Sequence, residues 1–431
     1  MIFALALLAH AGAVTLDEAW ERAESQSAEL AVVAEQRVQT DQIRTQAWAS
    51  LSPKISLGGD YVLNQRETAF DPSALFPQDV VDMIEAATGQ PLDFGDPLVI
   101  NKKHYFDANV TVTQPLFTTS AFPALLAAGA ISHAGHATEN AARAQIRLNV
   151  ARVYWGALVA REGQKVANEA MELAQKQAEI AASRLTAGTA TPQTELQARI
   201  AVARAHRDVL AANTRAATAN EALARFTGVD ADTGLETPIT PSIPVSGLAD
   251  AISAAADRPE IAAADGQARA ARLQLASADL TWLPKVDGRF TEAWSQNTGF
   301  SGEPNNWMVM VTGSWTLWDG GYRLAEQNKA ASNVRLTRAN AENQREVVHS
   351  DVVSAWEEWH RAQASLESAR QERGFAEENV RLSNVGFEAG TVSFVDAQAA
   401  AVGLSAARLT ELSEEMSADI AARALLVAIG E

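Results

Sequence analysis

The sequence VGFEAGTVSFVDA, residues 385–397, decides the fold of this chain because its central tripeptide occurs twice. Ala389-Gly390-Thr391 repeats Ala187-Gly188-Thr189, and each copy lies between a very long helical pattern and a second helix. Glycine adopts the left-handed backbone conformation that ends a helix, and threonine and the residues just after it can cap the next one. Each tripeptide therefore predicts a tight turn at the end of a helical hairpin.

Other landmarks along the chain also occur in pairs. The offset between the copies is 231 residues at Pro53 and Pro284, and 202 residues at Gly188 and Gly390. A duplication explains both values if one loop of the first half is about 30 residues longer. We therefore predict a first repeat at residues 14–228, a proline-containing connector at 229–247 and a second repeat at 248–431.

Proline placement outlines the helices. Proline is absent between Pro123 and Pro192 and after Pro304, and an interior proline costs a helix about 3 kcal/mol. Apolar residues in these spans recur at steps of three or four, which favours helix over strand. We expect long helices at 120–186 and 320–388, turns near 188 and 390, return helices at 192–227 and 394–429, and further helices at about 16–50 and 248–281.

Four segments instead alternate polar and apolar residues, at about 53–64, 106–117, 284–294 and 307–318. Each is about ten residues long with aromatic residues near its ends, as in strands that cross an outer membrane. The loop at 65–105 is long and contains a predicted short helix at 78–87, whereas the loop at 295–306 is short. The alternation by itself also allows a soluble sheet of two hairpins.

Four strands cannot close a barrel, and lipid does not tolerate an open sheet edge. If the strands span a membrane, the chain must therefore oligomerise. A dimer would supply eight strands, with an interior filled by side chains, whereas a trimer would supply twelve and leave room for an aqueous lumen. Long helices that leave the same rim favour the trimer.

Composition limits the function classes. The 431 residues include 53 acidic and 35 basic ones, and the formal net charge of −18 disfavours nucleic-acid binding. The absence of cysteine excludes disulfides, zinc–thiolate sites and thiol nucleophiles. Hydrophobic residues make up 47% of the chain but aromatic ones only 6%, which favours closely packed alanine-rich helices over a bulky core.

The first thirteen residues, MIFALALLAHAGA, are apolar and end in the small residues Ala11-Gly12-Ala13. We interpret residues 1–13 as a secretory signal peptide, with a buried N-terminal helix as the alternative. No other stretch contains about 18 consecutive apolar residues, so no transmembrane helix is expected.

Taken in order, the motifs resemble those of the TolC-type outer membrane factor family, the exit ducts of tripartite efflux pumps and type I secretion systems. They are Leu16-Asp17-Glu18-Ala19, Leu283-Pro284-Lys285, Leu317-Trp318-Asp319-Gly320-Gly321, Arg184-Leu185 with Gly188, and Gly390-Thr391 with Val395-Asp396. The resemblance implies an α+β membrane protein: a homotrimer with a twelve-stranded barrel in the lipid of the outer membrane and a long α-barrel in the periplasm. It also implies a passive, non-enzymatic conduit without a cofactor, whose tips close as an iris and meet a periplasmic membrane-fusion adaptor and, through it, an inner-membrane RND or ABC transporter.

The same resemblance implies roles for individual residues. Asp396 maps to an aspartate that forms a ring at the closed tip, where converging carboxylates would attract cations. Phe387 and Val392 stand where some relatives lock the tip with tyrosine and arginine, and Ala399 stands where a second acid is common. The implied adaptor-contacting residues are Arg184, Leu185, Gly188, Thr189, Gly390 and Thr391, and the strand-to-helix turn is Asp319, Gly320 and Gly321. Without the resemblance, Asp396 is more simply an acid favoured by a helix N-terminus.

The remaining clusters of polar residues have simple explanations. His133 and His136 lack an acidic or thiol partner nearby, which favours solvent exposure over metal binding. The glycines after Asp319 are not followed by the lysine of a phosphate loop, and no nucleophile elbow is present. The acids Glu411, Glu414 and Glu415 form a solvated helix face or line the lumen. The alternative function is a periplasmic coiled-coil scaffold without a membrane pore.

Overall fold

The computed structural model describes residues 13–230, 233–389 and 391–431. Residues 1–12 of the predicted signal peptide and Gly390 lie outside these described residues. The chain divides into two units. The helical unit contains residues 1–40, 133–267 and 337–431, and the strand unit contains residues 41–132 and 268–336.

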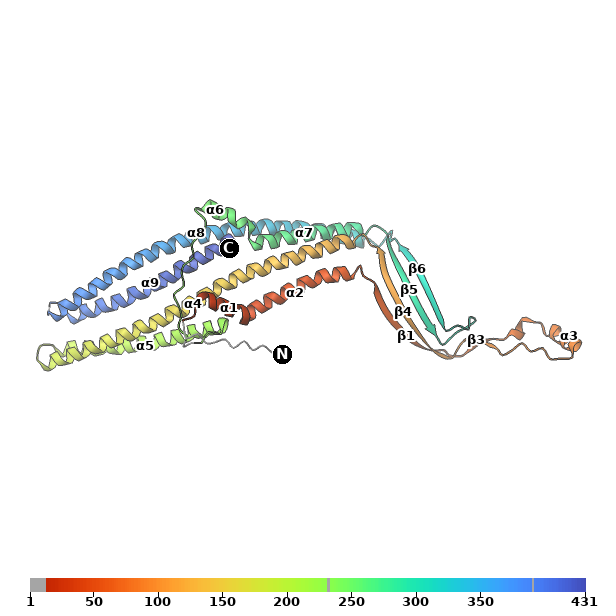
Figure 1. Cartoon of the computed structure of the whole chain (residues 1–431), viewed down its shortest axis with the longest axis horizontal. Helices are drawn as coiled ribbons and strands as arrows, with labels where there is room; N and C mark the ends of the chain where they lie inside the picture. Colours follow the sequence, from red (N-terminus) through yellow and green to blue (C-terminus); the bar gives the residue numbers. More distant parts are fainter. Residues whose placement is uncertain (1–12, 231–232, 390) are drawn as a thin grey trace. The chain divides into compact units, whose positions relative to one another are not determined.

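Groups of helices and groups of strands follow one another along the chain (Figure 1). In order, the elements are α1 (Leu16–Gln26), α2 (Ala28–Ala49), β1 (Lys54–Leu63), β2 (Thr68–Phe70), η1 (Pro72–Leu75), α3 (Gln78–Thr88), β3 (Leu98–Asn101), β4 (His104–Phe117), α4 (Ala121–Thr186), α5 (Pro192–Thr227), α6 (Leu248–Ala254), η2 (Ala255–Asp257), α7 (Pro259–Leu280), β5 (Lys285–Ser295), β6 (Asn305–Ser314), α8 (Tyr322–Glu388) and α9 (Phe394–Ile429). The predicted fold class, long helical hairpins combined with four antiparallel strands, is confirmed.

The larger of the two sheets described in the strand unit is antiparallel, with the order β1-β4-β5-β6, and the smaller one pairs β2 with β3 (Figure 1). Lys54 lies opposite Thr113 in the first pair of strands, and Lys285 lies opposite Ser314 in the last. The edge strands β1 and β6 each pair on one side only within the chain. Both expose apolar side chains: Ile55, Leu57, Tyr61 and Leu63 on β1, and Trp307, Val309 and Val311 on β6. The sheet therefore leaves two edges and much apolar surface for other groups to cover.

Three predicted segments are wrong in detail. The helix expected at 16–50 is interrupted by Ser27, whose extended backbone ends α1 and whose hydroxyl accepts a hydrogen bond from the Leu30 amide at 3.4 Å. The helix expected at 248–281 is interrupted at Arg258, because a residue before proline avoids the helical conformation. The strand expected to end at 318 ends at Ser314; the next residue, Trp315, lies outside the sheet, and its indole Nε1 donates to the Trp282 carbonyl oxygen at 3.0 Å. The pair β2 and β3 was not predicted.

The core of the helical unit consists of two clusters at equivalent positions of the two repeats. In the first, Ile146, Val150 and Leu223 are buried together with residues of α1. In the second, Val348, Val352 and Leu425 are buried together with residues of α6 and η2. Each pair of equivalent residues is separated by 202 positions. The duplicated apolar stripe of the long helices therefore forms the same packing twice.

A buried polar contact joins α4 of the first repeat to α9 of the second. The side chains of Trp155 and Asp419 belong to residues that are both 0% exposed, and the indole Nε1 donates to the carboxylate at 2.7 Å. The Arg423 Nε also donates to this carboxylate at 2.7 Å. Because a buried carboxylate is costly unless it is paired, these donors fix the two helices relative to each other at this level.

A second buried polar group, the Tyr154 hydroxyl, holds the start of the first repeat. It lies 2.5 Å from the Val14 carbonyl oxygen and 2.7 Å from the Glu236 carbonyl oxygen, and it accepts a hydrogen bond from the Glu236 amide at 2.9 Å. Burial raises the pKa of Tyr154 to about 12. The neutral hydroxyl is therefore the form that the folded chain favours.

We expect the stabilising effect of Tyr154 to disappear at high pH. An unfolded tyrosine ionises near pH 10, so the contribution of the neutral hydroxyl is fully present below about pH 10 and is lost as the pH rises towards 12. Tyr154→Phe should lower the Tm at pH 8, because lost hydrogen bonds cost about 1–2 kcal/mol, and the Tm difference from the wild type should shrink between pH 10 and 12. Thermal unfolding in detergent measures both values.

Tyr322→Phe is the matched control, because Tyr322 is 67% exposed. A Tm difference between wild type and Tyr154→Phe that stays constant from pH 8 to 12 would contradict the prediction.

Candidate functional site

The two hairpin tips share the same hydrogen bonds between a threonine and a carbonyl five residues before it. In the first, Gly188 takes a φ of +74°, and the Arg184 carbonyl accepts hydrogen bonds from the Thr189 amide at 2.8 Å and the Thr189 hydroxyl at 3.1 Å. In the second, the Gly386 carbonyl accepts from the Thr391 amide and hydroxyl at the same two distances. Both threonines therefore close the turn, and neither caps the next helix.

The helix caps come two residues later. The Thr191 hydroxyl accepts a hydrogen bond from the Thr194 amide at 3.3 Å and so caps α5. The Ser393 hydroxyl accepts from the Asp396 amide at 3.2 Å and so caps α9. The same hydroxyl donates to the Asp396 carboxylate at 2.7 Å. Asp396 is exposed in the first turn of α9, where the helix dipole favours an acid.

Two residues with different predicted roles, Arg184 and Phe387, meet between the two tips. The guanidinium carbon of Arg184 lies 4.5 Å from the centre of the Phe387 ring. Phe387 in turn lies against Phe394, with ring centres 6.3 Å apart and an interplanar angle of 64°. These rings pack with Ala181 and Ala198 in a small apolar cluster that joins the two hairpins. Of the other predicted tip residues, Leu185 lies in the last turn of α4, and Gly188, Thr189, Thr391 and Val392 lie on the turns that follow α4 and α8.

Gly386 is a constrained tip residue that was missed in the sequence. A Cβ atom at this position would lie 2.4 Å from Cγ2 of Val392, closer than real contacts allow. By contrast, a Cβ atom at Gly188 would meet nothing within 4 Å, and only its positive φ restricts that position. The signal was present in the 202-residue offset, which aligns Gly386 with Arg184 and so places a glycine where the first tip carries a long side chain.

The strand-to-helix turn at Asp319, Gly320 and Gly321 is fixed by hydrogen bonds and by two positive φ angles. The Asp319 carboxylate accepts from the Gly321 amide at 3.2 Å and from the Arg323 Nε at 2.7 Å. The hydrogen bond from the Arg323 side chain lowers the pKa of Asp319 below its usual value. The Arg323 guanidinium also lies 4.2 Å from the Trp282 ring centre. The turn therefore starts α8 and has no feature of a phosphate site.

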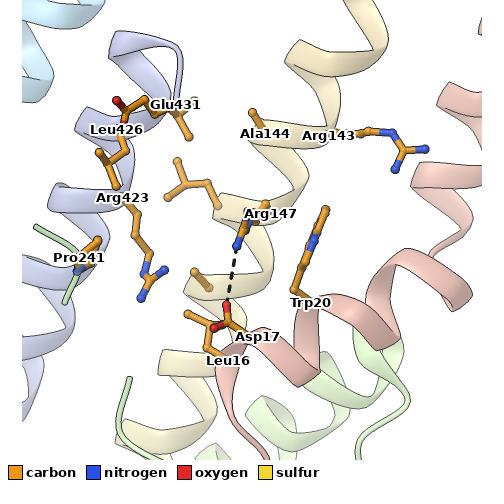
Figure 2. A pocket seen from close by; sticks show the side chains of 13 residues that line it. Leu16, Asp17, Trp20, Arg143, Ala144, Arg147, Pro241, Arg423, Leu426 and Glu431 are labelled. Carbon is orange, nitrogen blue, oxygen red and sulfur yellow. Dashed lines mark ion pairs between the residues drawn. The ribbon is translucent and has the colours of Figure 1, made fainter. Parts of the chain in front are cut away.

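Three arginines line a cavity of about 480 Å³ in the helical unit (Figure 2). Each arginine already has an acidic partner: Arg143 pairs with Glu24 and Glu139, Arg147 with Asp17, and Arg423 with Asp419. Figure 2 shows Arg147 directed towards Asp17 beside the Trp20 ring, whose centre is 5.7 Å from the guanidinium. Each arginine of the lining is therefore engaged in an ion pair, and we interpret the cavity as a seam between α1, α4 and α9.

Two further polar residues lie apart from the tips. His360 packs against Trp356 and Trp359, with ring centres 4.8 and 4.6 Å away. Glu411 pairs with Arg373 at 2.8 Å. In the part of the chain that the structure describes, three or more metal-binding side chains do not gather anywhere. No helix in that part combines the length and the apolarity needed to cross a bilayer.

Comparison with known proteins gives one family and one fold. The family model described as outer membrane efflux protein matches residues 19–229 and 252–431. No curated protein shows significant sequence similarity to the chain.

Three solved structures are similar over almost the whole chain. The outer membrane protein VceC from Vibrio cholerae is 18% identical with a TM-score of 0.74, and the match covers 96% of each chain. The outer membrane channel CmeC from Campylobacter jejuni is 14% identical with a TM-score of 0.77, covering 96% of this chain and 85% of that one. The open-state MtrE channel from Neisseria gonorrhoeae is 15% identical with a TM-score of 0.75, covering 96% and 88%.

We expect Gly386→Ala to loosen the second tip. The added methyl group would have to displace the short, branched Val392 side chain and with it the turn that the Gly386 carbonyl holds. Amide hydrogen exchange of residues 386–396 should therefore speed up, by about tenfold for each 1.4 kcal/mol of lost local stability.

The double variant Gly386→Ala with Val392→Ala should recover most of the protection, because the clashing atom is removed. Unchanged exchange in the single variant would contradict the steric argument.

Proposed function

The chain belongs to the outer membrane efflux protein family, and we propose that three copies of it form a passive exit duct that is gated at its periplasmic tips. Family membership places it in the outer membrane with an extension into the periplasm, as a channel and not an enzyme. The predicted resemblance to TolC-type channels is thereby confirmed. The outer membrane location argues against the alternative of a periplasmic scaffold without a pore.

The open sheet of the strand unit is the observation that supports a trimer. Its edge strands β1 and β6 pair on one side only, and the backbone groups on their free sides need partners in lipid. Pairing β1 of one copy with β6 of the next would satisfy these groups. Three copies would give twelve strands, enough for an aqueous lumen, and the exposed apolar residues of β1 and β6 would face lipid.

The tips provide the gate and the docking surface of the proposed duct. Asp396 is exposed at the start of α9, so three copies of the carboxylate around a narrow lumen would favour cations. Phe387 and Val392 would make this constriction apolar. The tip residues Arg184, Leu185, Gly188, Thr189 and Thr391, together with Gly390, would contact a periplasmic adaptor. This adaptor would link the duct to an inner-membrane RND or ABC transporter for efflux or type I secretion.

Membrane fractionation and bilayer recording test the duct. We expect the protein to be extracted from the outer membrane in detergent as an oligomer of three chains, and to give small cation-selective currents in planar bilayers. Recovery of a monomer in the osmotic-shock fraction would contradict the proposal.

Asp396→Asn should reduce the preference for cations and the block by divalent cations, because it removes three negative charges from the lumen of the trimer. Asparagine can still accept the hydrogen bond from Ser393, so assembly should not change. Reversal potentials in a salt gradient measure the selectivity.

Ser393→Ala is the matched control, since it removes the helix cap and keeps the carboxylate. If the wild type and Asp396→Asn were equally selective for cations, Asp396 would not be part of the gate.

A further inference from the structure

The segment between β1 and β4, residues 65–103, contains elements that the four-stranded sheet does not need. In it, β2 and β3 pair with each other, and η1 and α3 lie between them (Figure 1). The loop between β5 and β6, residues 296–304, contains neither helix nor strand, and its two strands still pair along their whole length. The long segment therefore has a purpose other than closing a hairpin. We call residues 65–103 the arm.

The base of the arm is fixed to this short loop. The Lys102 amide donates to the Asn297 Oδ1 at 3.2 Å, and the Asn297 Nδ2 donates to the Asn101 Oδ1 at 2.9 Å. The rings of Phe70 and Phe300 lie 6.3 Å apart, centre to centre. The arm therefore leaves the sheet from a defined place, at the end of β1 that is not joined to α2.

The arm is folded but has no core. All of its residues are described, and none of them is buried. Phe76 and Phe94 lie against each other with ring centres 5.3 Å apart, yet Phe76 is still 48% exposed. A segment that buries so little apolar surface does not offset the entropy lost on folding, so it needs a partner that covers it. The large apolar side chains that await this partner are Leu75, Phe76, Met83, Ile84 and Leu98.

Helix α3 of the arm is amphipathic. Val80, Met83 and Ile84 have the spacing of one helix face, and Met83 is 63% exposed. At about 100° per residue, Asp82 and Glu85 lie on the opposite face. A partner that packs on the apolar face therefore leaves both carboxylates in water.

The charge of the arm limits what can cover it. Between Glu67 and Asn101 it contains seven acidic residues and no lysine, arginine or histidine. An anionic lipid surface repels such a segment, and so does a nucleic acid. A second copy of the arm is compatible with this charge, because the acids of α3 lie away from its apolar face and are screened over about 8 Å at physiological salt.

The proposed trimer also brings the arms together. The arm follows directly on β1, and the free edge of β1 is the one that would pair with β6 of the next copy. Three arms would then project from one rim, each fixed at its base. Such tethering raises the effective concentration of each arm for the others, so a weak apolar contact suffices to join them.

We propose that the arms of three copies pack through their apolar faces into one cluster in front of the outer mouth of the duct. The proposal rests on the proposed trimer. Three-fold symmetry centres this arm cluster on the axis of the barrel, so exported material must pass the arms. Apolar packing holds the cluster together and the acidic residues oppose it, so added salt strengthens it by screening their repulsion.

Cross-linking of the full-length protein in detergent tests the arm cluster. The chain has no cysteine, so Met83→Cys introduces one thiol per copy. A short bismaleimide linker should join two of the three copies through these thiols, because the apolar faces meet. The yield of linked pairs should rise as the salt concentration is raised from about 0.05 to 0.5 M.

Asp82→Cys is the matched control. Asp82 is also exposed and is the neighbour of Met83, but it lies on the acidic face, and a helix is about 10 Å across. This variant should give at least about tenfold fewer linked pairs than Met83→Cys.

A second substitution in the Met83→Cys protein separates packing from random collision of the arms. Ile84→Ser removes an apolar side chain from the proposed contact and should lower the yield of linked pairs. Asp82→Ser introduces the same residue on the acidic face and should raise the yield, because it removes one repelling charge from each arm.

The size of the protein in detergent separates failure of the arm cluster from failure of the duct. An oligomer of three chains in which Met83→Cys gives no linked pairs, or as many as Asp82→Cys, would overturn the arm cluster and leave the duct intact. Pairs that become fewer as salt is added would show that opposite charges join the arms, and would overturn it too. A protein that stays a single chain would overturn the proposed trimer, and the arm cluster with it.

Discussion

The structure depends on one constraint: backbone groups at the edge of a sheet cannot remain unpaired in lipid. One chain supplies four strands, with β1 and β6 at the edges, and it cannot satisfy this constraint alone. In the proposed duct the partners are further copies of the same chain, so the barrel forces the helices of three copies to surround one axis. The narrow apolar stripe of the long helices suits this arrangement, because each helix keeps a large polar surface for water.

The duplication explains why the helices fit such a ring. Val150 and Val352 occupy equivalent places in two clusters that pack in the same way, 202 residues apart. The two hairpins of a chain therefore share their core packing and their turns although most of their residues differ, and two of the differences at the tips change the charge. Arg184 stands opposite Gly386 in this alignment, and Thr194 stands opposite Asp396. Both differences place charge on one hairpin only.

Local chemistry explains what could be predicted from the sequence. The alternation of polar and apolar residues around Leu57 and Val311 is local, so the strands could be predicted from the sequence. The positive φ of Gly188 depends on the glycine itself, so the first tip could be predicted as well. The break at Ser27 was not, because it depends on how α1 buries Ala19 and Ala23 against the rest of the cluster. The steric role of Gly386 and the meeting of Arg184 with Phe387 were also hidden, since both depend on which side chains the folded tips bring together. Residue roles in the gate and at the adaptor remain predictions from the family resemblance.

In the proposed duct, Arg184 would link the tip that contacts the adaptor to the other hairpin. Its carbonyl closes the first turn, and its guanidinium carbon lies 4.5 Å from the Phe387 ring centre. A carboxylate offered by a docking partner would compete for this guanidinium, because a hydrogen bond to a charged group contributes about 1.5–3 kcal/mol and an exposed cation–π contact about 0.5–1 kcal/mol. The side chain could not serve both partners at once, so docking and the contact with Phe387 would oppose each other. Because such coupling is reciprocal, the contact with Phe387 would weaken docking by the same factor by which docking weakens the contact.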